Sequence, residues 1–183
     1  MLYDTNPSIF SQLVIVETIQ AKDIDLRYLI DNFGIQLVLD HRFFHKYQED
    51  LPEITNLDKQ LLDKVKVGYF NLLNYPPLLK DVVIMAIIDP ILFIGDFYLN
   101  AFYVRSEGSV DIVVSDGDVN IKGRIDTLVF RDKLWVMIIE SKKASFSIEE
   151  GLAQILAYML GSSNSDKPCL GTIAIGSEFF LLN

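Results

Sequence analysis

Residues 123–143, GRIDTLVFRDKLWVMIIESKK, place ionisable side chains inside two otherwise apolar runs. An ionised group inside an apolar strand is unfavourable unless a partner compensates it. Asp126 and Glu140 offer carboxylates, and hard cations such as Mg²⁺ or Mn²⁺ prefer oxygen ligands, so this set suits metal-dependent phosphodiester hydrolysis. In that chemistry the two carboxylates and the backbone carbonyl of Ser141 hold the metal. Lys142 orients the attacking water or stabilises the developing charge.

Strand alternation predicts which of these groups share a face. Arg124 and Asp126 alternate with apolar residues, so one face of this strand is expected to be apolar and the other polar. If the turn is centred on Asp132, Arg124 lies opposite Glu140 and Asp126 lies diagonally beside it. Lys142, two residues beyond Glu140, then shares the same face.

The same spacing allows a purely structural interpretation. Arg124 can pair with Glu140, and Lys142 can pair with Asp126, so that the charges compensate one another without any catalysis. Spacing alone favours neither interpretation, and both stay open at this point.

These residues are expected to lie on an antiparallel sheet that is followed by a helix and a strand. Three extended runs after Asn100 are separated by the turn sequences SDGD and RDK. Ser147 and Glu150 form a capping box for an amphipathic helix that ends at Gly161. The last residues, CLGTIAIGSEFFLLN, have the pattern of a strand and the start of another.

The first hundred residues are expected to be mainly helical. Asp25 is a helix N-cap, and the helix that follows it ends at Gly34. A longer amphipathic helix begins at Asn56 or Asp58 and stops at NYPPLL.

We therefore expect one α/β (α+β) domain over residues 1–183, in which helices flank a central mixed sheet. Its mainly helical N-terminal region spans residues 1–100, and its core spans residues 101–183. The most apolar run, residues 82–95, is interrupted by Asp-Pro and is shorter than the roughly 20 residues that span a bilayer. It predicts core helices and no membrane contact.

Asp126 within GRID, the sequence ESK at residues 140–142, and a helix with Gln154 and Tyr158 together resemble the PD-(D/E)XK nuclease superfamily. The likeness is closest to the branch with a Q-x-x-x-Y motif, found in the N-terminal nuclease domain of type I restriction enzyme R subunits. It covers residues 103–182. The order of helix, three strands, helix and strand is similar to a restriction-endonuclease-like core.

The resemblance implies a Mg²⁺- or Mn²⁺-dependent endonuclease that cleaves DNA. Asp126 and Glu140 would hold the metal, and Lys142 would assist the water. Gln154 and Tyr158, four residues apart on one flank of their helix, would face the cleft and bind substrate.

Other ionisable residues are weaker candidates. The superfamily often adds an acidic residue from a helix before the sheet, and Asp58, Asp63 and Glu107 are the candidates here. His41 and His45 have helical i,i+4 spacing, but no third ligand follows in motif spacing, so we interpret them as structural.

Composition favours a cytoplasmic protein. The one cysteine, Cys169, allows no intramolecular disulfide, and residues 1–20 lack the pattern of a secretory leader. The net charge of −9 argues against a general electrostatic grip on nucleic acid, but residues 105–143 hold seven basic and seven acidic residues. The resemblance makes DNA the expected partner, and a homodimer is left open. The alternative is an inactive nuclease-fold module that binds nucleic acid or protein.

Overall fold

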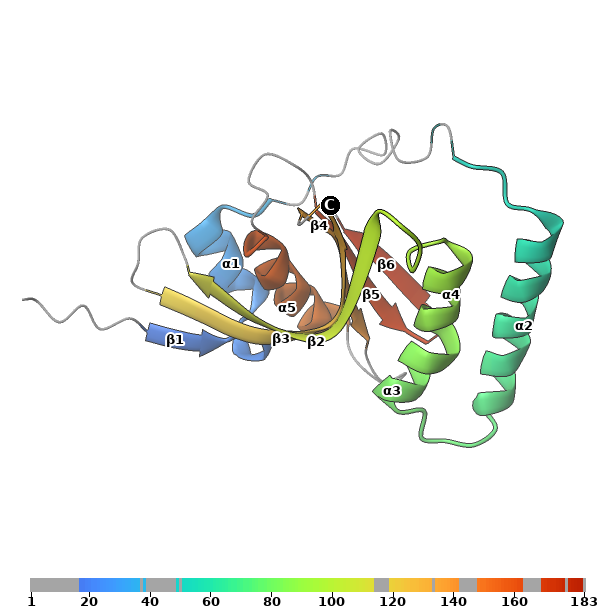
Figure 1. Ribbon diagram of the computed structural model, residues 1–183. Helices are drawn as coiled ribbons and strands as arrows, with labels where there is room; N and C mark the ends of the chain where they lie inside the picture. The colour runs from blue at the N-terminus through green and yellow to red at the C-terminus, as the bar shows by residue number, and fades with distance from the viewer. Residues whose placement is uncertain are drawn as a thin grey trace, which may run out of the picture.

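The computed structural model describes residues 17–36, 38, 49, 51–113, 119–132, 134–141, 148–162, 169–176 and 178–182. At residues 108–113, 134, 149 and 150 only the backbone is described. This part of the chain forms a six-stranded mixed sheet with helices on both faces (Figure 1). The expected mixed α/β architecture, with helices flanking a central sheet, is confirmed.

The strands are β1 (Glu17–Gln20), β2 (Phe102–Val113), β3 (Val119–Arg131), β4 (Leu134–Ser141), β5 (Leu170–Ile175) and β6 (Glu178–Leu182). Strands β2, β3 and β4 form the predicted antiparallel meander. β5 is parallel to β4, with α5 as the crossover, and β6 returns antiparallel to β5. β1 pairs in parallel with the start of β3.

The helical segments are η1 (Ala21–Asp23), α1 (Leu26–Phe33), α2 (Asn56–Leu72), α3 (Lys80–Val83), a π-helical turn η3 (Ile84–Ile88), α4 (Asp89–Ile94) and α5 (Ile148–Leu160). α1 and α5 cover one face of the sheet, and η3 and α4 cover the other. α2 lies outside α4, away from the sheet (Figure 1).

Local capping explains where the first helices begin. The Asp25 carboxylate accepts a hydrogen bond from the Tyr28 backbone N–H at 2.7 Å, and Gly34 ends α1 with a φ of 64°. Both predictions for this helix are confirmed. α2 begins at Asn56, as predicted, with Thr55 as its N-cap in a capping box with Asp58. The predicted cap of α5, Ser147, lies outside the described residues.

Part of the N-terminal region belongs to the sheet and its core. β1 was not expected from the sequence, because four residues, ETIQ, carry too little alternation to predict a strand. α1 and η1 pack on α5, so buried side chains from residues 21–29 join the same core as Ile121 and Ile173. This region is therefore integrated with the sheet.

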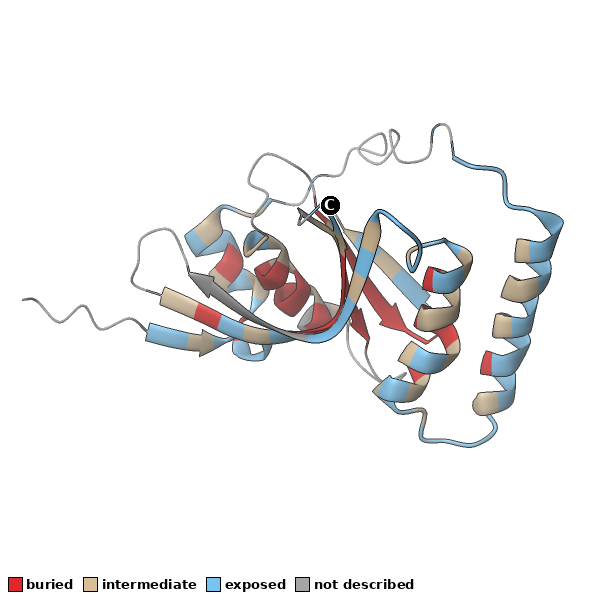
Figure 2. Cartoon of the chain, viewed as in Figure 1, coloured by how far each residue is buried: buried red, intermediate tan, exposed pale blue. Residues whose placement is uncertain are grey.

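Buried residues concentrate on the central strands and on α5, whereas α2 is mostly exposed (Figure 2). The largest core cluster lies between the sheet and the helices α1 and α5. A second cluster joins Leu92 of α4 to Val129 and Ile139 of the sheet. In the described ranges, no helix has both the length and the apolar character required to cross a membrane.

Candidate functional site

The candidate site lies where two strands share one edge of β3. β2 pairs along the whole of β3, while the other edge is taken by β1 at residues 119–122 and by β4 at residues 127–131. Residues 123–126 lie between these two partners. Their backbone groups on that edge therefore need other hydrogen-bond partners.

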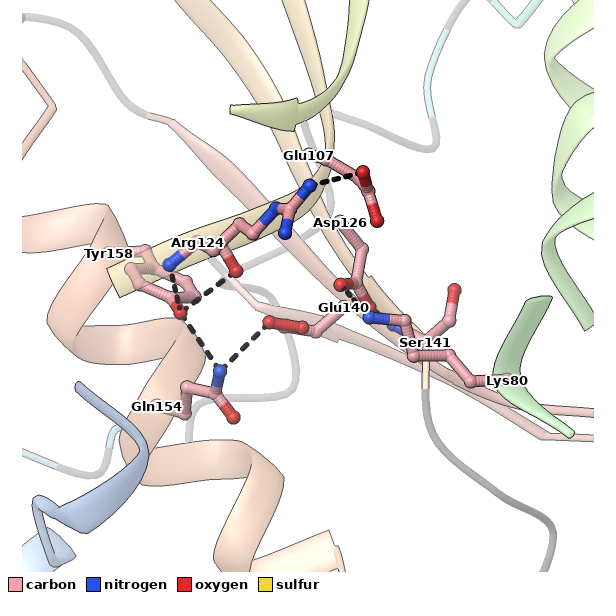
Figure 3. Close-up of polar contacts among 8 residues, drawn as sticks. All are labelled: Lys80, Glu107, Arg124, Asp126, Glu140, Ser141, Gln154 and Tyr158. Carbon is pink, nitrogen blue, oxygen red and sulfur yellow. Dashed lines mark hydrogen bonds and ion pairs between the residues drawn. The ribbon is translucent and has the colours of Figure 1, made fainter. Parts of the chain in front are cut away.

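Tyr158 of α5 supplies partners at this gap. Its hydroxyl accepts a hydrogen bond from the Arg124 N–H at 3.2 Å and donates one to the Arg124 carbonyl at 3.1 Å (Figure 3). The ring comes this close because residue 123 is glycine: a Cβ there would lie 2.7 Å from the Tyr158 hydroxyl oxygen. Burial raises the pKa of Tyr158 to about 12, so its hydroxyl stays protonated at neutral pH.

Asp126 and Glu140 meet where β3 and β4 begin to separate. The last pair of the ladder is Thr127 with Ile139, and the same register continued by one residue sets Asp126 opposite Glu140. The predicted pairing of Arg124 with Glu140 is therefore wrong. The hairpin turn falls after Asp132, and the register shifts between Val129 and Phe130, so the pairing moves by two residues. A shift of two keeps each side chain on its face.

Asp126 is 4% exposed, and among the described residues its carboxylate has two partners. The Ser141 backbone N–H donates to one oxygen at 2.8 Å, and the Lys80 amine contacts the other at 2.5 Å (Figure 3). By itself, burial would lower the pKa of Lys80. The hydrogen bond to Asp126 and the charges of Asp126, Glu140 and Asp81 outweigh burial, so the pKa is raised above its ordinary value.

Glu140 is buried deeper still, at 1% exposure. The Gln154 side-chain amide donates to Glu140 Oε1 at 3.0 Å and to the Tyr158 hydroxyl at 2.9 Å. The Q-x-x-x-Y pair on α5 thus links a carboxylate of β4 to the backbone of β3. Spacing on a helix predicted that Gln154 and Tyr158 share a flank, but their hydrogen bonds run to protein groups.

Of the two pairs in the structural interpretation, the one between Arg124 and Glu140 is not observed, and the one between Lys142 and Asp126 stays untested. Arg124 pairs with Glu107 of β2, and both side chains are exposed. Lys142 lies outside the described residues, so the role of its amine stays a prediction. Lys80, at the start of α3, was missed because it lies 46 residues before Asp126 and belongs to no motif.

The three candidates for a further acid lie on two different elements, α2 and β2. Asp58 caps α2, where its carboxylate accepts from the Thr55 N–H and hydroxyl. Asp63 is also on α2, outside α4. Glu107 of β2 lies between the pairs Ser106–Thr127 and Gly108–Ile125, so it falls across from Asp126, and its exposed carboxylate pairs with Arg124. His41 and His45 lie outside the described residues.

The oxygen atoms at this site suit a hard cation that takes only a few of its ligands from the protein. Among the described residues no three His, Cys, Asp or Glu side chains group to hold a metal. Mg²⁺ usually keeps several waters and needs only one or two carboxylates. Asp126 and Glu140 would supply these carboxylates, and the Ser141 carbonyl would supply a third oxygen. The Ser141 hydroxyl is buried without a partner in the described part of the chain, but strand alternation directs it to the face of β4 opposite Glu140, so it adds no ligand to this set.

These features define a mixed α/β domain with two buried carboxylates. They lie near residues 123–126 of β3, where the sheet divides between β1 and β4, and we call this place the fork. The sequence matches no protein-family model and no curated protein. The function is therefore inferred from the residues of the site and their geometry.

Proposed function

We propose that this protein is a metal-dependent nuclease that hydrolyses DNA phosphodiester bonds, built on a restriction-endonuclease-like core. The observation that carries the proposal is the adjacency of Asp126 and Glu140, two buried carboxylates from neighbouring strands. Two buried carboxylates at the end of the same ladder are unfavourable unless cations compensate their charges. Mg²⁺ or Mn²⁺ is the compensating ion that this donor set suits.

The chain's own residues prepare this chemistry. When bound, the ion would polarise the scissile phosphate and lower the pKa of the attacking water. Asp126 and Glu140 hold it, and the Ser141 N–H fixes the Asp126 carboxylate in place. The Lys80 side chain is 41% exposed and protonated, so it can turn from Asp126 to the phosphate and stabilise developing negative charge. Lys142 has the corresponding role in the sequence motif.

Gln154 and Tyr158 act as positioning residues in this proposal. Both are buried, and Gln154 donates to Glu140 while Tyr158 fixes the backbone of Arg124. They hold the carboxylate of β4 at a fixed distance from β3. Because a misplacement of about 1 Å can cost roughly a hundredfold in rate, their loss should lower cleavage.

The second candidate is an inactive module that keeps the fold and binds nucleic acid or protein. One observation favours it: Lys80 already neutralises Asp126, so the pair of carboxylates has an internal cation. The net charge of −9 points the same way. The two candidates differ in whether a divalent cation changes what the protein does.

The deciding experiment measures cleavage of labelled single- and double-stranded DNA while Mg²⁺ or Mn²⁺ is titrated. The variants are Glu140→Gln, which removes a ligand charge, and Glu178→Gln, a matched control on the exposed strand β6. We expect cleavage by the wild type and by Glu178→Gln, and none by Glu140→Gln. A folded wild type that cleaves no DNA at any metal concentration would favour the inactive module.

A further inference from the structure

A second surface on the same hairpin has the chemistry of a ligand site. A pocket of about 650 Å³ opens between the start of β2 and the end of β3. Tyr103, Val104, Arg105, Phe130 and Asp132 line it. None of these residues contributes to the carboxylate pair.

The pocket combines flat rings with a guanidinium. Tyr103 and Phe130 are cross-strand partners, and Arg105, two residues along β2, lies with its guanidinium carbon 5.3 Å from the centre of the Phe130 ring. Trp135 packs edge-on against Phe130, with 6.5 Å between the two ring centres, and helps to hold the Phe130 ring in place. Tyr103 is 70% exposed, so its ring is accessible to a ligand in the pocket.

We propose that Tyr103, Arg105 and Phe130 form a platform that stacks an unpaired base of single-stranded nucleic acid. An exposed ring beside a planar guanidinium stacks any base, and the guanidinium also attracts the phosphate that the base carries. The Asp132 carboxylate at the pocket edge can accept hydrogen bonds from a base edge but repels phosphate. A base in a duplex is already stacked and cannot enter, so the platform selects single strands.

The platform lies close to the carboxylate pair. Phe130 and Asp126 are four residues apart on β3, about 13 Å along the strand. One oligonucleotide can therefore contact both. The inference rests on the proposed function in one respect: it takes the strand bound by the platform to be the substrate of the carboxylate site.

The test measures the Kd of a fluorescent single-stranded DNA of about ten nucleotides, a length that such surfaces bind. Fluorescence anisotropy in EDTA keeps the measurement free of cleavage. Tyr103→Ala removes the exposed ring, Tyr103→Phe keeps it, and Tyr75→Ala is the matched control. Tyr75 is also exposed, at 75%, but lies between α2 and α3.

We expect Tyr103→Ala to raise the Kd roughly 5- to 100-fold, the loss expected for one base stack. Tyr103→Phe and Tyr75→Ala should bind like the wild type. An abasic strand of equal length, which keeps its phosphates, should bind as weakly to the wild type as normal DNA binds to Tyr103→Ala. Equal Kd values for Tyr103→Ala and the wild type, equal binding of normal and abasic strands, or no binding of single strands would each overturn the platform.

The result is separate from that of the cleavage experiment. Binding that depends on Tyr103 without any cleavage would contradict the nuclease and leave the platform intact. Cleavage that depends on Glu140, with a Kd insensitive to Tyr103→Ala, would contradict the platform and leave the nuclease intact.

Discussion

At the scale of single residues, the site is a chain of buried polar groups. Glu140 accepts from Gln154, Gln154 donates to Tyr158, and Tyr158 bridges both backbone groups of Arg124. Each group satisfies a neighbour that would otherwise be unfavourable in the interior. Removing the polar group at one position should therefore leave the next group in the chain without its hydrogen-bond partner.

Tyr158→Phe tests this chain. It keeps the ring but leaves the Arg124 N–H and carbonyl without the hydroxyl, so the free energy of unfolding should fall by about 1–3 kcal/mol. Urea denaturation measures it. Tyr69→Phe is the matched control, since Tyr69 is also buried but no hydrogen bond of its hydroxyl is found among the described residues. Equal losses in the two variants would contradict the bridging role.

Lys80→Met tests the competition between the amine and a metal at Asp126. Without the amine, Asp126 is free to bind a divalent cation, so Mg²⁺ should stabilise the variant at lower concentration than the wild type. Cleavage should nevertheless fall, because the phosphate loses a positive charge. Weaker Mg²⁺ binding in Lys80→Met would show that the amine and the metal do not share Asp126.

The Lys80 pair also has a defined pH dependence. The pKa of Lys80 is raised in the folded state, so its contribution to stability is complete below the unfolded value of 10.5 and is lost as pH rises through the folded value. The stability difference between wild type and Lys80→Met should thus be constant from pH 7 to about 9 and shrink above 10.5. Denaturation at a series of pH values measures it, and a difference that grew in alkali would contradict the pair.

At the scale of elements, the site depends on α5 lying close against the gap in the edge of β3. Gly123 permits this approach, because the Tyr158 ring occupies the space that a Cβ would need. The gap itself exists because β1 and β4 take different parts of the same edge. The helix and the fork are therefore one structural unit.

Gly123→Ala should force α5 away from β3 and lower the free energy of unfolding by about 1–3 kcal/mol, as overpacking does. Gly68→Ala is the control, since Gly68 lies in α2 with open space around it. That change should raise stability by about 0.5–1 kcal/mol, because alanine loses less backbone freedom in a helix. Thermal denaturation compares the two, and a stabilising effect of Gly123→Ala would contradict the close packing.

At the scale of the whole molecule, a metal at the fork would stabilise the entire fold, because its two carboxylate ligands, Asp126 and Glu140, belong to different strands. A ligand that binds only the folded state adds about 2.7 kcal/mol at a concentration 100 times its Kd. Mg²⁺ or Mn²⁺ should therefore raise the Tm of the wild type.

Asp126→Asn should remove most of this rise. The asparagine oxygen can still accept from the Ser141 N–H, so the fold is expected to persist while the ligand charge is lost. Differential scanning fluorimetry with and without the metal measures both proteins. An equal rise in Tm in the variant would remove Asp126 from the metal site.

The sequence by itself determined the features that depend on neighbouring residues. Asp25 and Gly34 mark the two ends of α1. The turn and the alternating runs predict the hairpin of β3 and β4, and the alternation predicts that Asp126 and Glu140 share a face. These follow from capping, turn chemistry and strand alternation, which act over a few residues. The sequence alone was therefore sufficient to identify the two carboxylates as a candidate site.

Only the tertiary structure decided which distant groups complete the site. Lys80 reaches Asp126 across 46 residues, Gln154 donates to Glu140, and the four-residue strand β1 takes the part of the β3 edge beyond β4. The position of the turn and the shift of register between Val129 and Phe130 together set Asp126, in place of Arg124, opposite Glu140. Such contacts depend on how whole elements pack against one another, and no local pattern of the chain encodes them.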